Sequence, residues 1–156
     1  MIRLFDISLQ LNGFPIKKAK AELDKIVHFS EEEYAVFLQN KKKENVDFHL
    51  KNNSFYKELI GNKTTQNWED LPILNKQNLQ KPLEERLSNG YSKSNIYLNK
   101  TSGSSGTPFV FAKDKYSHAL TWASNIMRFG WFGIDFNHSC FILFRVVYYE
   151  KRLGFI

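Results

Sequence analysis

The sequence predicts an α/β protein in which helices come first and strands follow. In residues 1–94 apolar residues recur mainly at helical spacing, which indicates a mainly helical segment. From residue 95 they begin to alternate with polar residues, as in a strand. The stretch from Cys140 to Tyr149 is apolar, β-branched and aromatic, which is typical of a buried strand. We therefore expect residues 95–156 to hold strands and a helix that are part of one larger α/β domain.

The composition favours a folded protein without a membrane segment. Of the 156 residues, 42 % are hydrophobic, which is enough for a core, and the single cysteine excludes an intramolecular disulfide framework. No apolar run reaches the length of a signal peptide or a bilayer span. We expect a soluble, cytoplasmic protein. The formal charge is +6, and the basic residues cluster in two groups, Lys17, Lys18 and Lys20, and Lys41, Lys42 and Lys43. Solvated helix faces are the favoured interpretation of these clusters, with nucleic-acid binding as the minority alternative.

Two helices are predicted from local signals in the first segment. The residues Ser30 to Glu33 form a capping box, so a helix should begin there, with Tyr34, Phe37 and Leu38 on its apolar stripe, and end near the asparagines at 52 and 53. A short helix over "SFYKELI" should follow and stop at Gly61.

A further helix is predicted to begin at Asn75. Its apolar positions would be Leu79, Leu83 and Leu87, and Asn89-Gly90 would end it. Pro82 interrupts this pattern and would kink or split the helix.

The second segment is predicted to begin with a hairpin of two strands. Ile96 and Leu98 alternate with polar neighbours, and "PFVFAK" resumes extended structure after the intervening loop, followed by a turn at "AKDK". A helix should run from Lys115 to Gly130, capped by Asp114. Its apolar residues follow one another at alternating steps of four and three: Tyr116, Leu120, Ala123 and Met127.

The loop between these strands is the candidate site. It contains two glycines, five hydroxyl side chains and a proline: Thr101, Ser102, Gly103, Ser104, Ser105, Gly106, Thr107 and Pro108. Glycines let the backbone approach a ligand closely, and successive N–H groups in such a loop can converge on an anion. The loop therefore has what is needed to hold a polyphosphate, with a plain loop or linker as the alternative. It matches neither the Walker pattern nor a dinucleotide fingerprint.

The motif "TSGSSGTP" resembles the phosphate-binding loop of the adenylate-forming enzymes, the acyl-CoA synthetase superfamily. The pattern of that loop is roughly [ST]-[ST]-G-[ST]-[ST]-G-x-P, and residues 101–108 meet every fixed position. The stretches "FYKEL", "LPILNKQNL" and "GWFGIDF" are similar to one branch, the phenylacetate–CoA ligases and capsular polysaccharide biosynthesis proteins. The opening "FDISLQLNGFPI" resembles the start of the latter group.

The resemblance implies an ATP-dependent ligase. A small carboxylic acid would attack the α-phosphate of ATP to give an acyl-adenylate and pyrophosphate. A second nucleophile, often coenzyme A, would then take the acyl group. Residues 101–108 would hold the β- and γ-phosphates together with Mg²⁺. Phe109 departs from the pattern, because relatives often carry a basic residue directly after the proline.

The resemblance also implies that this chain corresponds to the first third of such an enzyme, with an incomplete sheet. Segments that bind adenine and ribose lie further along in relatives. We expect no adenylating activity from the chain alone, so that ATP- and carboxylate-dependent pyrophosphate release would contradict this expectation. The remainder of a split enzyme is then a candidate partner. The alternative is a non-catalytic remnant, or a small module that binds nucleotide or a partner chain.

Two other features are explained better by packing than by chemistry. His138 and Cys140 would share one face of a strand, but a cysteine in an apolar run is usually a packing residue. Arg128 lies on the helix after the loop, and a surface or packing role is favoured over contact with a phosphate.

Overall fold

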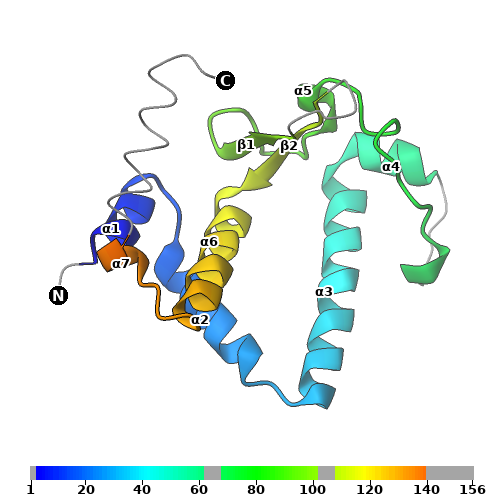
Figure 1. Ribbon diagram of the computed structural model, residues 1–156. Helices are drawn as coiled ribbons and strands as arrows, with labels where there is room; N and C mark the ends of the chain where they lie inside the picture. The colour runs from blue at the N-terminus through cyan, green and yellow to red at the C-terminus, as the bar shows by residue number, and fades with distance from the viewer. Residues whose placement is uncertain (1–2, 62–67, 102–107, 140–156) are drawn as a thin grey trace. The chain divides into compact units, whose positions relative to one another are not determined.

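The architecture is α/β, and the described part of the chain contains helices and one pair of antiparallel strands (Figure 1). It is given by a computed structural model, which describes residues 3–61, 68–101 and 108–139. The predicted strand from Cys140 to Tyr149 lies outside the described residues.

The chain divides into two compact units. The first joins Met1–Val27 to Lys115–Ile156, and the second is His28–Asp114. The second unit holds both helices and strands, and the boundary expected after residue 94 falls inside it. None of the helices that the structure describes combines the length and the apolar character needed to cross a bilayer.

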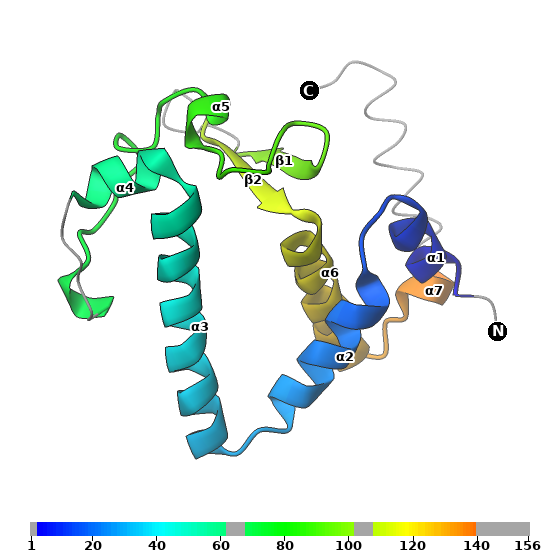
Figure 2. The ribbon, with the colours of Figure 1, turned by 180° about the vertical axis from the view of Figure 1, so that it is seen from behind.

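The first unit is a helical cluster. Its elements are α1 (Leu4–Leu11), α2 (Ile16–Val27), α6 (Lys115–Gly130) and α7 (Phe136–Ser139). Helix α2 packs along α6, and α1 contacts both α2 and α7 (Figure 2). The predicted helix from Lys115 to Gly130 is therefore confirmed, and Asp114 directly precedes it.

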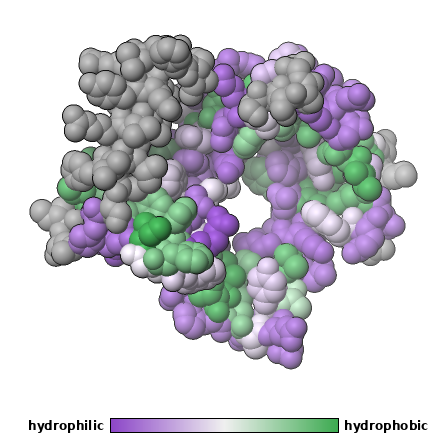
Figure 3. Space-filling model, in the orientation of Figure 1, coloured by the Kyte–Doolittle hydropathy of each residue, from purple (hydrophilic) through white to green (hydrophobic). Residues whose placement is uncertain are grey.

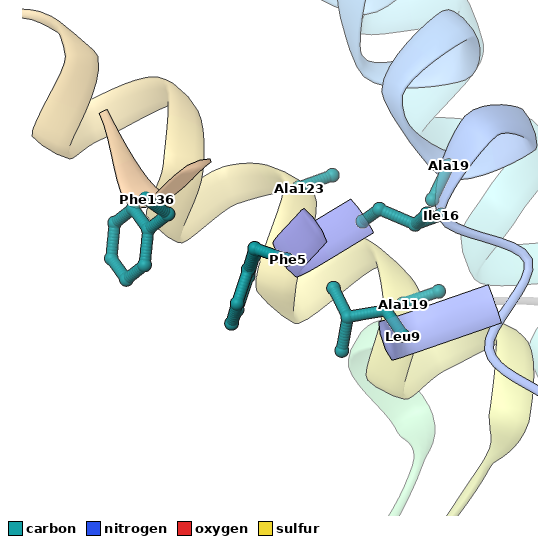
Figure 4. Close-up of a cluster of buried hydrophobic side chains, with 7 residues drawn as sticks. All are labelled: Phe5, Leu9, Ile16, Ala19, Ala119, Ala123 and Phe136. Atoms are coloured by element: carbon teal, nitrogen blue, oxygen red, sulfur yellow. The ribbon is translucent and has the colours of Figure 1, made fainter. Parts of the chain in front are cut away.

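The core of the first unit combines small and large apolar side chains (Figure 4). Ile16 and Ala19 on α2 and Ala119 on α6 are fully buried, so the two helices pack closely where their side chains are small. The core cluster comprises Phe5, Leu9, Ile16, Ala19, Ala119, Ala123 and Phe136. The buried carboxylate of Asp6 accepts hydrogen bonds from Lys20 Nζ at 2.7 and 2.8 Å, which joins α1 to α2.

The second unit begins with α3 (Glu31–Asn52), whose capping box is confirmed. The Glu33 N–H donates to Ser30 Oγ at 3.2 Å, and the Ser30 N–H donates to Glu33 Oε2 at 2.8 Å. The expected apolar stripe is not buried: Tyr34 and Leu38 are exposed, and no residue of α3, all of which the structure describes, is buried. The helical spacing of apolar residues predicts an apolar face, but it does not predict that another element packs against that face.

The predicted short helix is also confirmed. Helix α4 (Ser54–Ile60) is capped by Asn53, whose Oδ1 accepts from the Tyr56 N–H at 2.8 Å. It ends at Gly61, whose φ of +70° lies in the region that glycine adopts without strain. A 3₁₀ helix follows at Trp68–Asp70.

The helix predicted to begin at Asn75 and end at Asn89-Gly90 is wrong as a continuous helix, whereas the split expected at Pro82 is confirmed. Asn75 and Asn78 each accept from the other's backbone N–H, at 3.1 and 2.9 Å, and close one turn only. A four-residue helix, α5 (Leu83–Arg86), then begins after Pro82. Proline lacks an N–H and keeps the preceding residue out of the helical region, so the two turns do not join.

The hairpin is confirmed, with two corrections. Strands β1 (Ile96–Lys100) and β2 (Val110–Asp114) pair antiparallel. The turn expected at "AKDK" is wrong, because Lys113 and Asp114 continue β2 opposite Tyr97 and Ile96, and α6 begins at the next residue. The expected alternation of burial is absent too, since Leu98 is half exposed. A sheet of two strands is narrow, so it buries less of its side-chain surface than a wider sheet does.

The surface mixes apolar and polar side chains (Figure 3). In the first unit the exposed large apolar residues include Phe129, Trp131, Phe132 and Ile134, which follow closely at the end of α6 and after it.

A candidate phosphate-binding hairpin

The candidate loop connects β1 to β2, and the strands fix where it begins and ends. Lys100 lies opposite Val110 at the end of the ladder. Of the motif, the structure describes Thr101 and Pro108, while residues 102–107 lie outside the described residues. Phosphate binding by this motif stays a prediction.

Thr101 and Phe109 hold the two ends of the loop together. The Thr101 N–H donates to the Phe109 carbonyl at 2.9 Å, and the Phe109 N–H donates to Thr101 Oγ1 at 3.0 Å. These bonds add one more pair to the ladder, in which a side-chain oxygen takes the place of a backbone carbonyl. Because the hydroxyl oxygen accepts here, its hydrogen remains able to donate to a ligand.

The described motif residues limit what the loop can offer an anion. The Thr101 N–H is already used, and Pro108 has no N–H. Among the described motif residues, the donor available to a phosphate is therefore the Thr101 hydroxyl. Backbone donors for a phosphate would have to come from residues 102–107.

Arg86 lies against the exit of the loop, and the sequence analysis missed it. Its Nη2 donates to the Val110 carbonyl and its Nε to the Lys81 carbonyl, both at 2.8 Å. Its Cζ lies 5.4 Å from the centroid of the Phe109 ring, within the range of a cation–π contact. Partial burial lowers the pKa of Arg86. No sequence signal connects Arg86 to Val110, because the two are 24 positions apart.

A network of polar side chains holds the backbone of Arg86. Asn53 is buried, and its Nδ2 donates to the Arg86 carbonyl at 2.9 Å and to Ser88 Oγ at 3.0 Å. Ser88 Oγ lies 3.4 Å from His49 Nδ1, and burial lowers the pKa of His49. The corner between α3 and α4 is thereby joined to α5.

A pocket of about 380 Å³ opens between α5 and the hairpin. Its walls are mainly apolar, with Lys81 and Lys93 among the lining residues, and Lys93 pairs with Glu84. The other lining residues are Leu79, Gln80, Pro82, Leu83, Glu84, Leu98, Pro108, Phe109 and Val110. The volume is near the lower end of the range for small-molecule sites.

The other candidate residues have ordinary structural surroundings. His138 Nδ1 lies 2.7 Å from Asp135 Oδ2, and hydrogen bonds from the Asn137 N–H and His138 lower the pKa of Asp135. The proposed partner Cys140 lies outside the described residues. Arg128 donates to Asn125 Oδ1 on its own helix.

Both lysine clusters lie on helices and include lysines that pair with nearby carboxylates. Lys20 pairs with Asp6, Lys41 with Glu44 and Lys43 with Asp47. No group of three or more His, Cys, Asp or Glu residues that could hold a metal ion occurs among the described residues.

Comparisons of the chain with protein-family models, with curated proteins and with solved structures find no match. The family resemblance therefore depends on residues 101–108 and the flanking stretches of the sequence.

Proposed function

We propose that this chain provides the triphosphate-binding part of an ATP-dependent adenylate-forming ligase. The observation that carries the proposal is the motif at residues 101–108, which joins the two strands of a hairpin closed by Thr101 and Phe109. A linker would not need paired strands at both ends. A binding loop needs them, because its donors must keep their positions before the ligand arrives.

The proposed reaction activates a small carboxylic acid. The carboxylate oxygen attacks the α-phosphorus of ATP, the bond to the bridging oxygen breaks, and pyrophosphate leaves with that electron pair. Hydroxyl and backbone donors of the loop would stabilise the charge that develops on pyrophosphate. Mg²⁺ commonly arrives with the phosphates of a nucleotide, and the neutral hydroxyl of Thr101 fits beside such a complex. A second nucleophile, with the thiol of coenzyme A as one candidate, takes the acyl group and releases AMP.

The proposal extends to the fold and the cellular role. We infer that the hairpin belongs to a larger sheet, that the remaining part of the ligase is its partner, and that the reaction takes place in the cytoplasm. The similarity of several stretches to capsular polysaccharide biosynthesis proteins supports a role in surface polysaccharide assembly.

The test compares the binding of ATP with that of AMP, and the binding of ATP by the wild type with that by a variant that lacks the Thr101 hydroxyl. Calorimetric titration of the full chain should give tighter binding of ATP with Mg²⁺ than of AMP, because AMP lacks the two phosphates assigned to the loop. Thr101→Val removes the hydroxyl donor and also the acceptor of the Phe109 N–H, so it should weaken ATP binding by at least about two- to tenfold, the value of one net hydrogen bond, and should leave AMP binding unchanged. Thr101→Ser keeps the hydroxyl and is the matched control. Equal affinities for ATP and AMP, or no effect of Thr101→Val, would contradict the proposal.

A further inference from the structure

The register of the hairpin turns the carbonyl groups of alternate β2 residues away from β1, and Val110 is the first of these residues after the loop. Thr101 and Phe109 form a hydrogen-bonded position of the ladder. Hydrogen-bonded and non-hydrogen-bonded positions alternate along an antiparallel pair, so the next pair, Lys100 and Val110, is non-hydrogen-bonded. The Val110 carbonyl therefore points to the edge of β2 that lies away from β1, where no further strand pairs with it among the described residues.

Arg86 supplies that partner. Its guanidinium joins the Val110 carbonyl on β2 to the Lys81 carbonyl before α5, and it lies over the Phe109 ring. Two carbonyl groups and a ring are contacted by one planar group with donors in fixed directions. The ammonium of a lysine is a compact charge and would not reproduce this geometry.

The backbone of Arg86 is held in turn by the buried side chain of Asn53. The chain of contacts therefore runs from the α3–α4 corner through Asn53 to Arg86, and from Arg86 to Val110 and Phe109. Phe109 is the residue whose carbonyl and N–H close the loop on Thr101. Each contact in this chain is a directional hydrogen bond or a ring contact, so a shift of Arg86 would be transmitted to the loop ends.

We propose that Arg86 is a positioning residue for the two ends of the candidate loop: it fixes the edge of β2, and so the Thr101–Phe109 pair. That Arg86 matters for ATP binding rests on the proposed function. That Arg86 positions the loop ends does not rest on it, and this effect is measured without any nucleotide.

The experiment is amide hydrogen exchange of the full chain with Arg86→Ala and Arg86→Lys. Both variants should accelerate exchange of the Thr101 and Phe109 amides by roughly tenfold or more, because a bond from a charged donor is lost. The Lys57 amide, which donates to Asn53 within the same unit, should exchange at an unchanged rate. Arg128→Ala and Arg128→Lys are the matched controls, because Arg128 lies in the other unit and bonds within its own helix.

Chemical rescue separates positioning from general destabilisation. Millimolar guanidinium chloride should restore slow exchange of the two amides in Arg86→Ala, and ammonium chloride at the same ionic strength should not. Unchanged exchange of Thr101 and Phe109, or acceleration of Lys57 to the same extent, would overturn the inference. If the wild-type chain binds no ATP, the proposed function fails, and the exchange result still decides the role of Arg86.

Discussion

The two units of this protein are held together by different forces. Seven buried apolar side chains from α1, α2, α6 and α7 form the core of the first unit. In the second unit α3 has no buried residue along its full described length, and the buried residues include Asn53 and Ser88 beside a few apolar ones. The first unit depends mainly on apolar packing, and the second to a greater extent on directional hydrogen bonds.

The difference bears on the candidate site, because the ends of the candidate loop lie in the second unit. Apolar packing is non-directional and fixes positions through volume, whereas a satisfied polar network fixes particular groups in particular orientations. At Thr101 and Phe109, the two ends of the loop, the direction of the hydrogen-bonding groups matters more than the volume of the side chains. Asn53 and Arg86 provide it through bonds to backbone carbonyl groups. Substitutions that remove volume should therefore affect the first unit most, and substitutions that remove one donor the second.

The largest effect is expected for Ile16→Ala. Ile16 is fully buried between helices of the first unit, so the variant should lower the free energy of unfolding by about 2–5 kcal/mol. Urea unfolding followed by circular dichroism gives the value. Leu11→Ala removes an apolar side chain that is 84 % exposed and should change it by less than about 0.5 kcal/mol. Similar losses for both variants would mean that the apolar core described here does not form.

A smaller effect is expected for Asn53→Ala. The variant removes the cap of α4 and leaves the Arg86 carbonyl and the Ser88 hydroxyl without their donor, at a cost of about 2–4 kcal/mol. Urea unfolding again measures the loss. The neighbouring Asn52→Ala removes only an exposed bond to the Phe48 carbonyl and should cost less than about 1 kcal/mol.

Asn53→Asp sharpens this result. It retains an oxygen that can accept from the Tyr56 N–H, but it lacks the donor to Arg86 and Ser88. A variant as stable as the wild type would show that the cap alone matters and that the network does not.

The smallest effect is expected for the dependence of the stability of the second unit on pH. Burial lowers the pKa of His49 below its ordinary value of 6.5, so the unfolded chain takes up this proton at higher pH than the folded chain. The stabilising contribution is fully present above pH 6.5 and is lost as the pH falls through the lowered pKa. The urea midpoint should decrease over that window, and His49→Gln should flatten the decrease. An identical pH profile in the variant would assign the dependence to other groups.

Local signals in the sequence predicted local structure well. The capping box at Ser30, the end of α4 at Gly61 and the helix from Lys115 depend on neighbouring residues, and all three are confirmed. The helix predicted from Asn75 does not form as one piece, and the split expected at Pro82 is what the structure shows. The apolar stripe predicted on α3 is not buried, because spacing describes a helix face but not what covers it.

By itself the sequence determined the beginning of α3, the end of α4, the extent of α6, the hairpin and the position of the glycine loop within it, because caps, breakers and alternation act over a few residues. Only the tertiary structure decided that Arg86 lies on Phe109 and bonds the edge of β2, and that Asn53 holds the backbone of Arg86. The two hydrogen bonds join residues that are 24 and 33 positions apart, and all of these contacts depend on how the chain folds back on itself.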